Sequence, residues 1–193
     1  MYRPFDELTR FSFRHACTDA GVTLSAENEE RVMAAYNGLG SFADADRALD
    51  AVSSNPQLEA WVFSNGTRSM VSSSLTSSPS LSGPATAAGI LVDDRERQHR
   101  IVSIDDQLKL YKPDPRTYGH MVEASGAARA GSVWLVSSNP FDALGAVAAG
   151  MQSAWVDRAG SGWVDGLAGA LGMRPTVVVK GVDEAVEEIL KRA

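Results

Sequence analysis

The chain has 193 residues, 44% hydrophobic and 22% charged, a composition typical of a globular protein with one sizeable core. Its formal net charge of -6 disfavours the clustered basic surface that nucleic acid or an anionic membrane requires. We expect no secretion leader, and no apolar run in the sequence is long enough to span a bilayer. The one cysteine, Cys17, cannot form an internal disulfide and with three histidines gives no zinc-binding spacing, so we expect a cytoplasmic protein without a metal or cofactor.

The first fifty residues predict helices. Apolar residues recur at helical spacing over 5–20, and Ser25 is a good N-cap for a second amphipathic helix. A third helix is predicted over 44–52, and the turn that follows leads into an apolar run.

From residue 60 onward, short apolar runs alternate with helical segments. The sequence predicts strands at 61–63, 101–104, 133–136, 154–156 and 176–179. It predicts helices at 117–124, at 141–149 and after Gly181. This alternation favours an α/β fold with a Rossmann-like, doubly wound parallel sheet. The Ser- and Pro-rich stretch 72–89 is interpreted as a flexible surface loop, and the charge run 93–100 as a solvated insertion.

Polar residues follow two of the predicted strands. Ser64 and Asn65, before Gly66, offer a hydroxyl, an amide and exposed N–H groups that could cradle an anion, although an ordinary capped turn has the same composition. Lys112 precedes Pro113, whose restrained backbone suits a fixed positive charge that meets a carboxylate. A lone lysine is more often solvated, so this residue by itself decides little.

A second polar segment begins where the strand at 133–136 ends. It runs Ser137-Ser138-Asn139, with Asp142 as its single acid and Gly145 able to allow close helix packing. Because ligands of open α/β sheets lie beyond the carboxyl ends of the strands, the segments around residues 64, 112 and 137 together predict one polar pocket that holds a carboxylate group.

These three segments resemble the second, third and fourth motifs of the haloacid dehalogenase superfamily. The pattern Ser-Ser-Asn-x-x-Asp-x-x-Gly-Ala from residue 137 is most similar to the type II 2-haloacid dehalogenases. The resemblance implies a partial helical cap over 1–43 and a Rossmann-like core over 44–193, with a surface insertion near 76–100. It also implies a small carboxylate substrate, and a homodimer is one assembly that it leaves open.

The resemblance implies hydrolytic dehalogenation of a 2-haloalkanoic acid to a 2-hydroxy acid through an aspartyl ester. The implied catalytic residues are Lys112, Asp142, Ser137 and Asn139. The implied substrate-binding residues are Ser64, Asn65 and Tyr118, and no residue is assigned to a metal. The substrate, its stereochemistry and the halogen are left open.

Phosphatases of the superfamily are an alternative. They carry acidic residues in the fourth motif to hold Mg²⁺, because a hard cation needs carboxylate oxygens. Here Ser137 and Ser138 occupy those places, and Asp142 alone supplies a metal site poorly. The sequence therefore favours the dehalogenase interpretation.

The family's first motif, an apolar strand that ends in the nucleophilic Asp, has no match in this chain. The stretch 90–94 resembles such a strand but lacks the Gly-Thr that follows in the family. We therefore expect the central first strand to be missing, and the chain to be an inactive, N-terminally truncated form of a longer enzyme. A non-catalytic remnant or an interaction protein of the same fold is the other interpretation.

Overall fold

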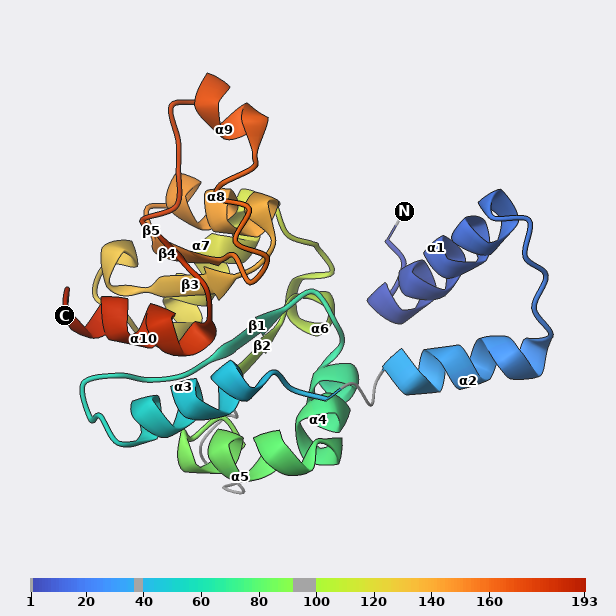
Figure 1. The fold of residues 1–193 in the computed structure, drawn as a ribbon, viewed down its shortest axis with the longest axis horizontal. Coiled ribbons are helices and arrows are strands. Elements are labelled where there is room, and N and C mark those ends of the chain that lie inside the picture. Colours follow the sequence, from blue (N-terminus) through green and yellow to red (C-terminus); the bar gives the residue numbers. More distant parts are fainter. Residues whose placement is uncertain (1, 37–39, 92–99) are drawn as a thin grey trace.

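The computed structural model describes residues 2–36, 40–91 and 100–193 (Figure 1). The helices are α1 (Phe5–Asp19), α2 (Ala26–Tyr36), α3 (Ala43–Ser53), α4 (Arg68–Ser77), α5 (Pro79–Ala87), α6 (Ile104–Leu108), α7 (Pro115–Ser125), the short 3₁₀ helix η1 (Ala130–Ser132), α8 (Pro140–Ala148), α9 (Gly166–Ala170) and α10 (Val182–Leu190). The strands are β1 (Val62–Ser64), β2 (Ile101–Ser103), β3 (Trp134–Ser137), β4 (Gln152–Val156) and β5 (Val177–Val179).

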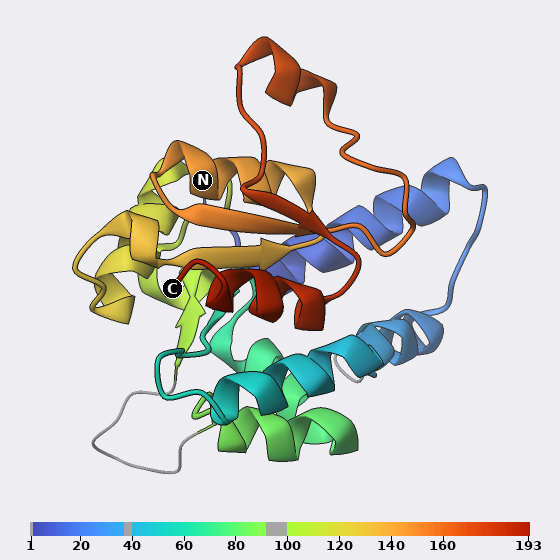
Figure 2. The same ribbon diagram turned by 60° about the vertical axis from the view of Figure 1, so that its left-hand side comes forward.

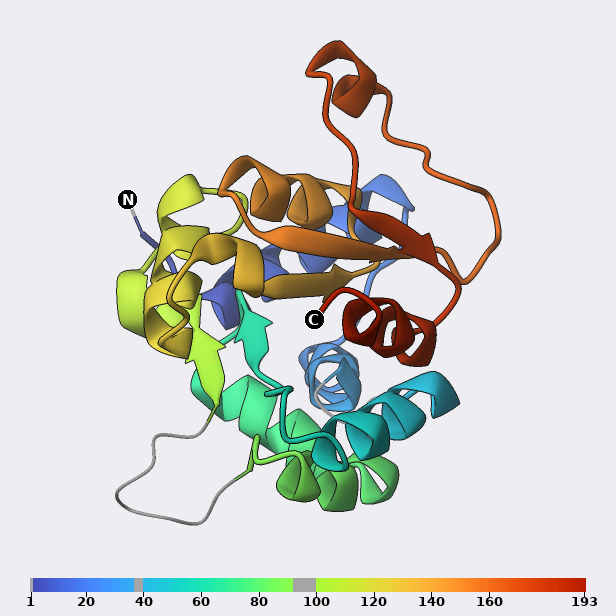
Figure 3. The same cartoon turned by 90° about the vertical axis from the view of Figure 1, so that its left-hand side faces the viewer.

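The strands form two parallel sheets, which confirms the predicted α/β class. One sheet has the order β1-β2 and the other the order β3-β4-β5, and all pairs are parallel. Within the described ranges no strand pairing joins β1 to β3, so each of these strands keeps one free edge. The two sheets run crosswise to each other in Figures 2 and 3.

One hydrophobic core connects the two sheets in spite of this separation. It contains Val102 of β2 and Leu135 of β3 together with Tyr118 and Met121 of α7 and Ala146 of α8, all of them buried. Each large apolar side chain buried in this way contributes about 1.5–3 kcal/mol. Helix α8 therefore packs on β3 and β4, and α7 packs on α8 and supplies the core residues between the two sheets.

Helix α10 covers the opposite face of the larger sheet and also packs on α3. Asp44 of α3 accepts hydrogen bonds from the N–H of Val182 at 2.8 Å and from the guanidinium of Arg158 at 2.6 Å. A Cβ at Gly181 would lie 3.2 Å from the Cβ of Asp44, so this glycine allows a close approach between the start of α10 and α3. The beginning of α10 is thus fastened to α3, and helices lie on both faces, as in a doubly wound fold.

The stretch 72–89 was predicted to be a surface loop, and this prediction is wrong. Thr67 caps α4 by accepting a hydrogen bond from the N–H of Met70, and Pro79 stands in the first turn of α5, where its missing N–H costs nothing. Ala85 of α5 is fully buried in a cluster with Ile90 and Ile101. The predicted insertion near 76–100 therefore contains a packed helix. Of its charge run, 93–100, only Arg100 lies within the described residues, and it pairs with Glu59 at 2.9 Å.

The N-terminal helices α1 and α2 lie to one side of the sheets (Figure 1). Ser25 accepts a hydrogen bond from the N–H of Asn28, which confirms it as the cap of α2. Glu29 of α2 pairs with Arg10 and Arg14 of α1, each at 2.8 Å, and these pairs hold the two helices together. Across the described residues, none of the helices combines the length and apolar character needed to cross a membrane.

Candidate functional site

Lys112 lies between the two sheets. Its ammonium group donates to the Asp142 carboxylate at 2.7 Å and to the Phe63 carbonyl at 3.1 Å. The N–H of Val62 donates to the carbonyl of Arg100, on the side of β2. Because the backbone groups of successive strand residues point to opposite sides, the Phe63 carbonyl points to the free edge of β1. The pair between Lys112 and Asp142 is almost completely buried, with side chains 9% and 4% exposed.

Tyr118 completes this polar network from α7. Its hydroxyl donates to the second oxygen of Asp142 at 2.9 Å, and its ring meets Phe63 edge to face at 5.6 Å. The ring lies so close to α8 that a Cβ at Gly145 would come within 2.7 Å of its Cε2 atom. Close packing at Gly145, expected from the sequence, is therefore confirmed. We call Lys112, Asp142 and Tyr118 the lysine network.

We expect stability to depend on the Tyr118 hydroxyl at alkaline pH. Burial, and then the negative charge of Asp142, raise the pKa of Tyr118 far above its ordinary value of about 10. The folded state therefore keeps a proton that the unfolded state loses above about pH 10, and this contribution to stability decreases by about 1.4 kcal/mol per pH unit. Tyr118→Phe should lower the free energy of unfolding at pH 8 but make it less dependent on pH above 10.

Urea unfolding of both proteins from pH 8 to pH 11 measures this dependence. The comparison with the parent protein is necessary because the pKa values of other tyrosines, Tyr2 and Tyr111, are also raised. Equal slopes for the variant and its parent above pH 10 would contradict a buried, protonated Tyr118.

The turn after β1 holds the backbone of Lys112. The Asn65 side chain accepts from the Lys112 N–H at 2.8 Å, and its amide nitrogen lies 3.5 Å from the Lys112 carbonyl oxygen. Ser64 accepts a hydrogen bond from the N–H of Gly66 at 3.0 Å. Of the three residues predicted to bind substrate, Tyr118 belongs to the lysine network, Asn65 contacts the lysine loop directly, and the Ser64 oxygen stabilises its own turn.

The segment after β3 forms a similar turn. The Ser137 hydroxyl accepts from the Asn139 N–H at 3.1 Å, and the Asn139 side chain is exposed. Asp142 follows in the first turn of α8, where the positive helix end favours a carboxylate. The predicted residues Lys112, Asp142, Tyr118 and Asn65 therefore meet in one network, and Ser137 and Asn139 lie at the strand end beside it.

The sequence analysis missed three polar residues at the carboxyl end of β2. Ser103 and Asp105 are buried, and Asp106 accepts a hydrogen bond from the Ser103 hydroxyl at 2.8 Å. The rule that singled out the ends of β1 and β3 applies equally to this strand, so the signal was present in the sequence.

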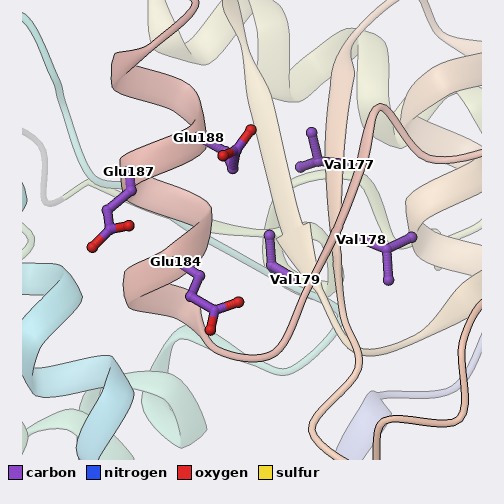
Figure 4. Close-up of a pocket in the computed structure, with 6 residues that line it drawn as sticks. All are labelled: Val177, Val178, Val179, Glu184, Glu187 and Glu188. Carbon is purple, nitrogen blue, oxygen red and sulfur yellow. The ribbon is translucent and has the colours of Figure 1, made fainter.

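Two cavities lie outside the lysine network. One, of about 420 Å³, is formed by Val177, Val178 and Val179 of β5 and by Glu184, Glu187 and Glu188 of α10 (Figure 4). The other, of about 450 Å³, lies among α1, α2 and α4 and is lined in part by Asp6, Glu7, Arg10, Glu30, Thr67 and Met70. Acidic side chains prevail in both, which disfavours an anionic ligand. Thr67, which lines the second cavity, directly follows the turn formed by Ser64 and Gly66, so this cavity lies next to that turn.

No cluster of three or more His, Cys, Asp or Glu side chains that could hold a metal ion occurs in the part of the chain that the structure describes. No protein-family model matches the sequence.

Known proteins of one kind resemble the chain in sequence and in structure. It is 26% identical over 183 residues to an (S)-2-haloacid dehalogenase of Pseudomonas fluorescens. The aligned residues cover 95% of this chain and 71% of that protein. It is 32% identical over 161 residues to (S)-2-haloacid dehalogenase 4A of Burkholderia cepacia, covering 83% and 62% of the two proteins. The crystal structure of an L-2-haloacid dehalogenase superposes with a TM-score of 0.80 at 25% identity, over 98% of this chain and 74% of the other.

The likeness extends over most of the chain and includes the strands whose carboxyl ends meet at the lysine network. Fold and sequence therefore agree with the three motifs. In sequence and in fold the chain is similar to (S)-2-haloacid dehalogenases, which supports its assignment as a type II haloacid dehalogenase-like protein of the haloacid dehalogenase superfamily.

Proposed function

We propose that the complete protein hydrolyses a 2-haloalkanoic acid to a 2-hydroxy acid. A carboxylate attacks the carbon that bears the halogen, the halide leaves with the bonding electron pair, and an ester forms. Water then hydrolyses the ester, which restores the carboxylate and yields the hydroxy acid and a proton. The observation that carries this proposal is the buried ammonium of Lys112 at the free edge of β1, bound to Asp142.

The nucleophile in this proposal is an aspartate at the end of a further strand between β1 and β3. Each of these strands has a free edge, and unpaired strand edges inside a fold are ordinarily covered. A parallel strand in that position would end beside Lys112, because the carboxyl ends of parallel strands lie at the same side of a sheet. We therefore propose that the 193-residue chain has no activity without this strand.

The lysine network supports the roles that we propose. Lys112 orients the nucleophile and offsets its charge, and Asp142, held by Tyr118, keeps the ammonium in place. Ser137 and Asn139 hydrogen-bond to the nucleophilic carboxylate. Ser64 and the N–H groups of its turn bind the substrate carboxylate.

We also propose a division into a partial helical cap, 1–43, and a core, 44–193. In support, α1 and α2 lie beside the sheets, whereas α3 packs on α10. The proposal includes a cytoplasmic protein and a homodimer. Sedimentation of the purified protein measures the dimer directly.

Chloride release from 2-chloropropionate tests the proposed function. The 193-residue chain should release no measurable chloride. A product that carries an additional N-terminal strand ending in Asp should release chloride without added metal and with a chelator present. In that longer protein, Lys112→Ala should lower the rate by about 10²–10³-fold, the usual effect of removing one preorganised charge-stabilising group.

Two outcomes would contradict the proposal. Turnover by the 193-residue chain would show that the nucleophile is already present. Phosphatase activity that a chelator abolishes would favour the phosphatase interpretation instead. If the longer protein binds 2-chloropropionate but shows neither activity, the protein is a non-catalytic member of the fold.

A further inference from the structure

We propose that Asp105 is a positioning residue that sets the place of Lys112 and ties its loop to the segment before helix α1. The proposal rests on the proposed function only in that it takes Lys112 to be the lysine of the site.

Asp105 is 2% exposed and receives two hydrogen bonds from tyrosines. Its Oδ1 atom accepts from the Tyr2 hydroxyl at 2.7 Å and from the Tyr111 hydroxyl at 2.8 Å. A buried carboxylate is costly unless it is hydrogen-bonded, so each phenol that is lost weakens this arrangement. We call Asp105, Tyr2 and Tyr111 the tyrosine clamp.

The tyrosine clamp reaches Lys112 through the neighbouring residue. Tyr111 directly precedes Lys112, whose backbone is held on the other side by the Asn65 amide. The lysine side chain then extends to Asp142. Three contacts therefore fix the lysine: the preceding side chain, its own backbone and its ammonium group.

The same clamp attaches the beginning of the chain to the core. Tyr2 lies 103 positions from Asp105 in the sequence, and its ring stacks on Tyr111 with centroids 6.3 Å apart. Phe5, the first residue of α1, packs against Tyr111 at 5.6 Å, and the Tyr111 hydroxyl contacts the Arg3 carbonyl. A movement of α1 away from the core would therefore pull directly on the residue before Lys112.

Asp106 offers a matched control. It is adjacent to Asp105 and has the same charge, but it is exposed and bonds to the N–H of Arg68 and to Ser103. These contacts secure the beginning of α4 rather than Tyr111. Asp105→Asn and Asp106→Asn thus remove the same charge from the same helix, and only the first replaces the charged acceptor of the tyrosine clamp by a neutral, weaker one.

The experiment measures how fast an amine-acylating reagent modifies Lys112, located by mass spectrometry in the 193-residue protein. Asp105→Asn should accelerate this modification about tenfold, because hydrogen bonds to a charged group are weakened and the loop opens more often. Asp106→Asn should leave the rate within about twofold of the parent rate. Amide hydrogen exchange in α1 should accelerate in Asp105→Asn alone.

Tyrosine titration gives a second measure of the clamp. Loss of solvation and the charge of Asp105 raise the pKa of Tyr2 to about 12, and the same causes raise the pKa of Tyr111 above its ordinary value. The Lys109 ammonium lies 5.8 Å from the Tyr2 ring and is unchanged by either variant. Both tyrosine pKa values, followed by carbon NMR of the phenol rings, should fall in Asp105→Asn and stay in Asp106→Asn.

The outcomes separate the proposal from its alternatives. If the tyrosine pKa values fall in Asp105→Asn but the Lys112 modification rate is unchanged, Asp105 is a purely structural residue and the proposal is overturned. Equal effects of Asp105→Asn and Asp106→Asn on the modification rate would also overturn it. If Asp105→Asn does not fold, Tyr111→Phe removes one donor only, and it should accelerate Lys112 modification in the same direction. None of these measurements needs turnover, so a failure of the proposed dehalogenase activity would leave them interpretable.

Discussion

Replacing Lys112 with methionine should lower the free energy of unfolding by about 3–5 kcal/mol, the usual cost of leaving one partner of a buried ion pair alone. The side chains of Lys112 and Asp142 are 9% and 4% exposed, so water cannot replace the lost ammonium. Methionine keeps most of the volume, and the loss therefore reports on charge rather than on a cavity. Urea unfolding at pH 7 measures the difference.

Two further variants separate this effect from a general one. Arg116→Ala breaks the exposed pair with Asp114, whose side chains are 70% and 27% exposed, and should change stability by less than about 1 kcal/mol. Lys112→Met combined with Asp142→Asn should recover part of the loss, because the amide needs no cation and still accepts from Tyr118. A double variant as unstable as the sum of both single variants would contradict the pairing.

Gly145→Ala should destabilise the protein by about 1–3 kcal/mol or more, although alanine is normally the better residue in a helix. An added Cβ would lie 2.7 Å from the Cε2 atom of Tyr118, and that ring is fully buried. Either α8 must move away from α7, or Tyr118 must release Asp142. Thermal unfolding together with tyrosine NMR measures both consequences.

Gly119→Ala is the matched control for this prediction. Gly119 lies in α7, and a Cβ there would meet nothing within 4 Å. This substitution should stabilise the protein by about 1 kcal/mol through helix propensity alone. Destabilisation by both substitutions would show that α7 and α8 tolerate no change at all, and would remove the special role of Tyr118.

Most strands and helices could be predicted because their sequence patterns are local. The stretch 72–89 could not, since its Ser, Pro and Gly residues have the composition of a loop. Its small side chains become helical because Ala85 is buried against Ile90 and Ile101. This packing depends on β2, which lies outside the stretch, so tertiary contacts override local propensity.

The site was predictable to a similar extent. Lys112, Asp142 and Tyr118 were identified from their motifs, and the structure brings them together. Asn65 was predicted to bind substrate, which stays a prediction, and its side chain also accepts a hydrogen bond from the Lys112 backbone. The position of Asp105 after a predicted strand could have singled it out, but its contact with Tyr2, 103 positions away, could not be predicted from the sequence. Such a contact leaves no periodic signal.

The hydrogen bond from Val182 to Asp44 joins residues that are 138 positions apart. During synthesis at about 5–20 residues per second, α3 waits roughly 7 to 28 s for α10 to emerge. During that interval the apolar side of α3 that α10 later covers is available to chaperones. Expression at lower temperature or with additional chaperone should therefore increase the yield of folded protein. A change of buffer after purification should increase it less.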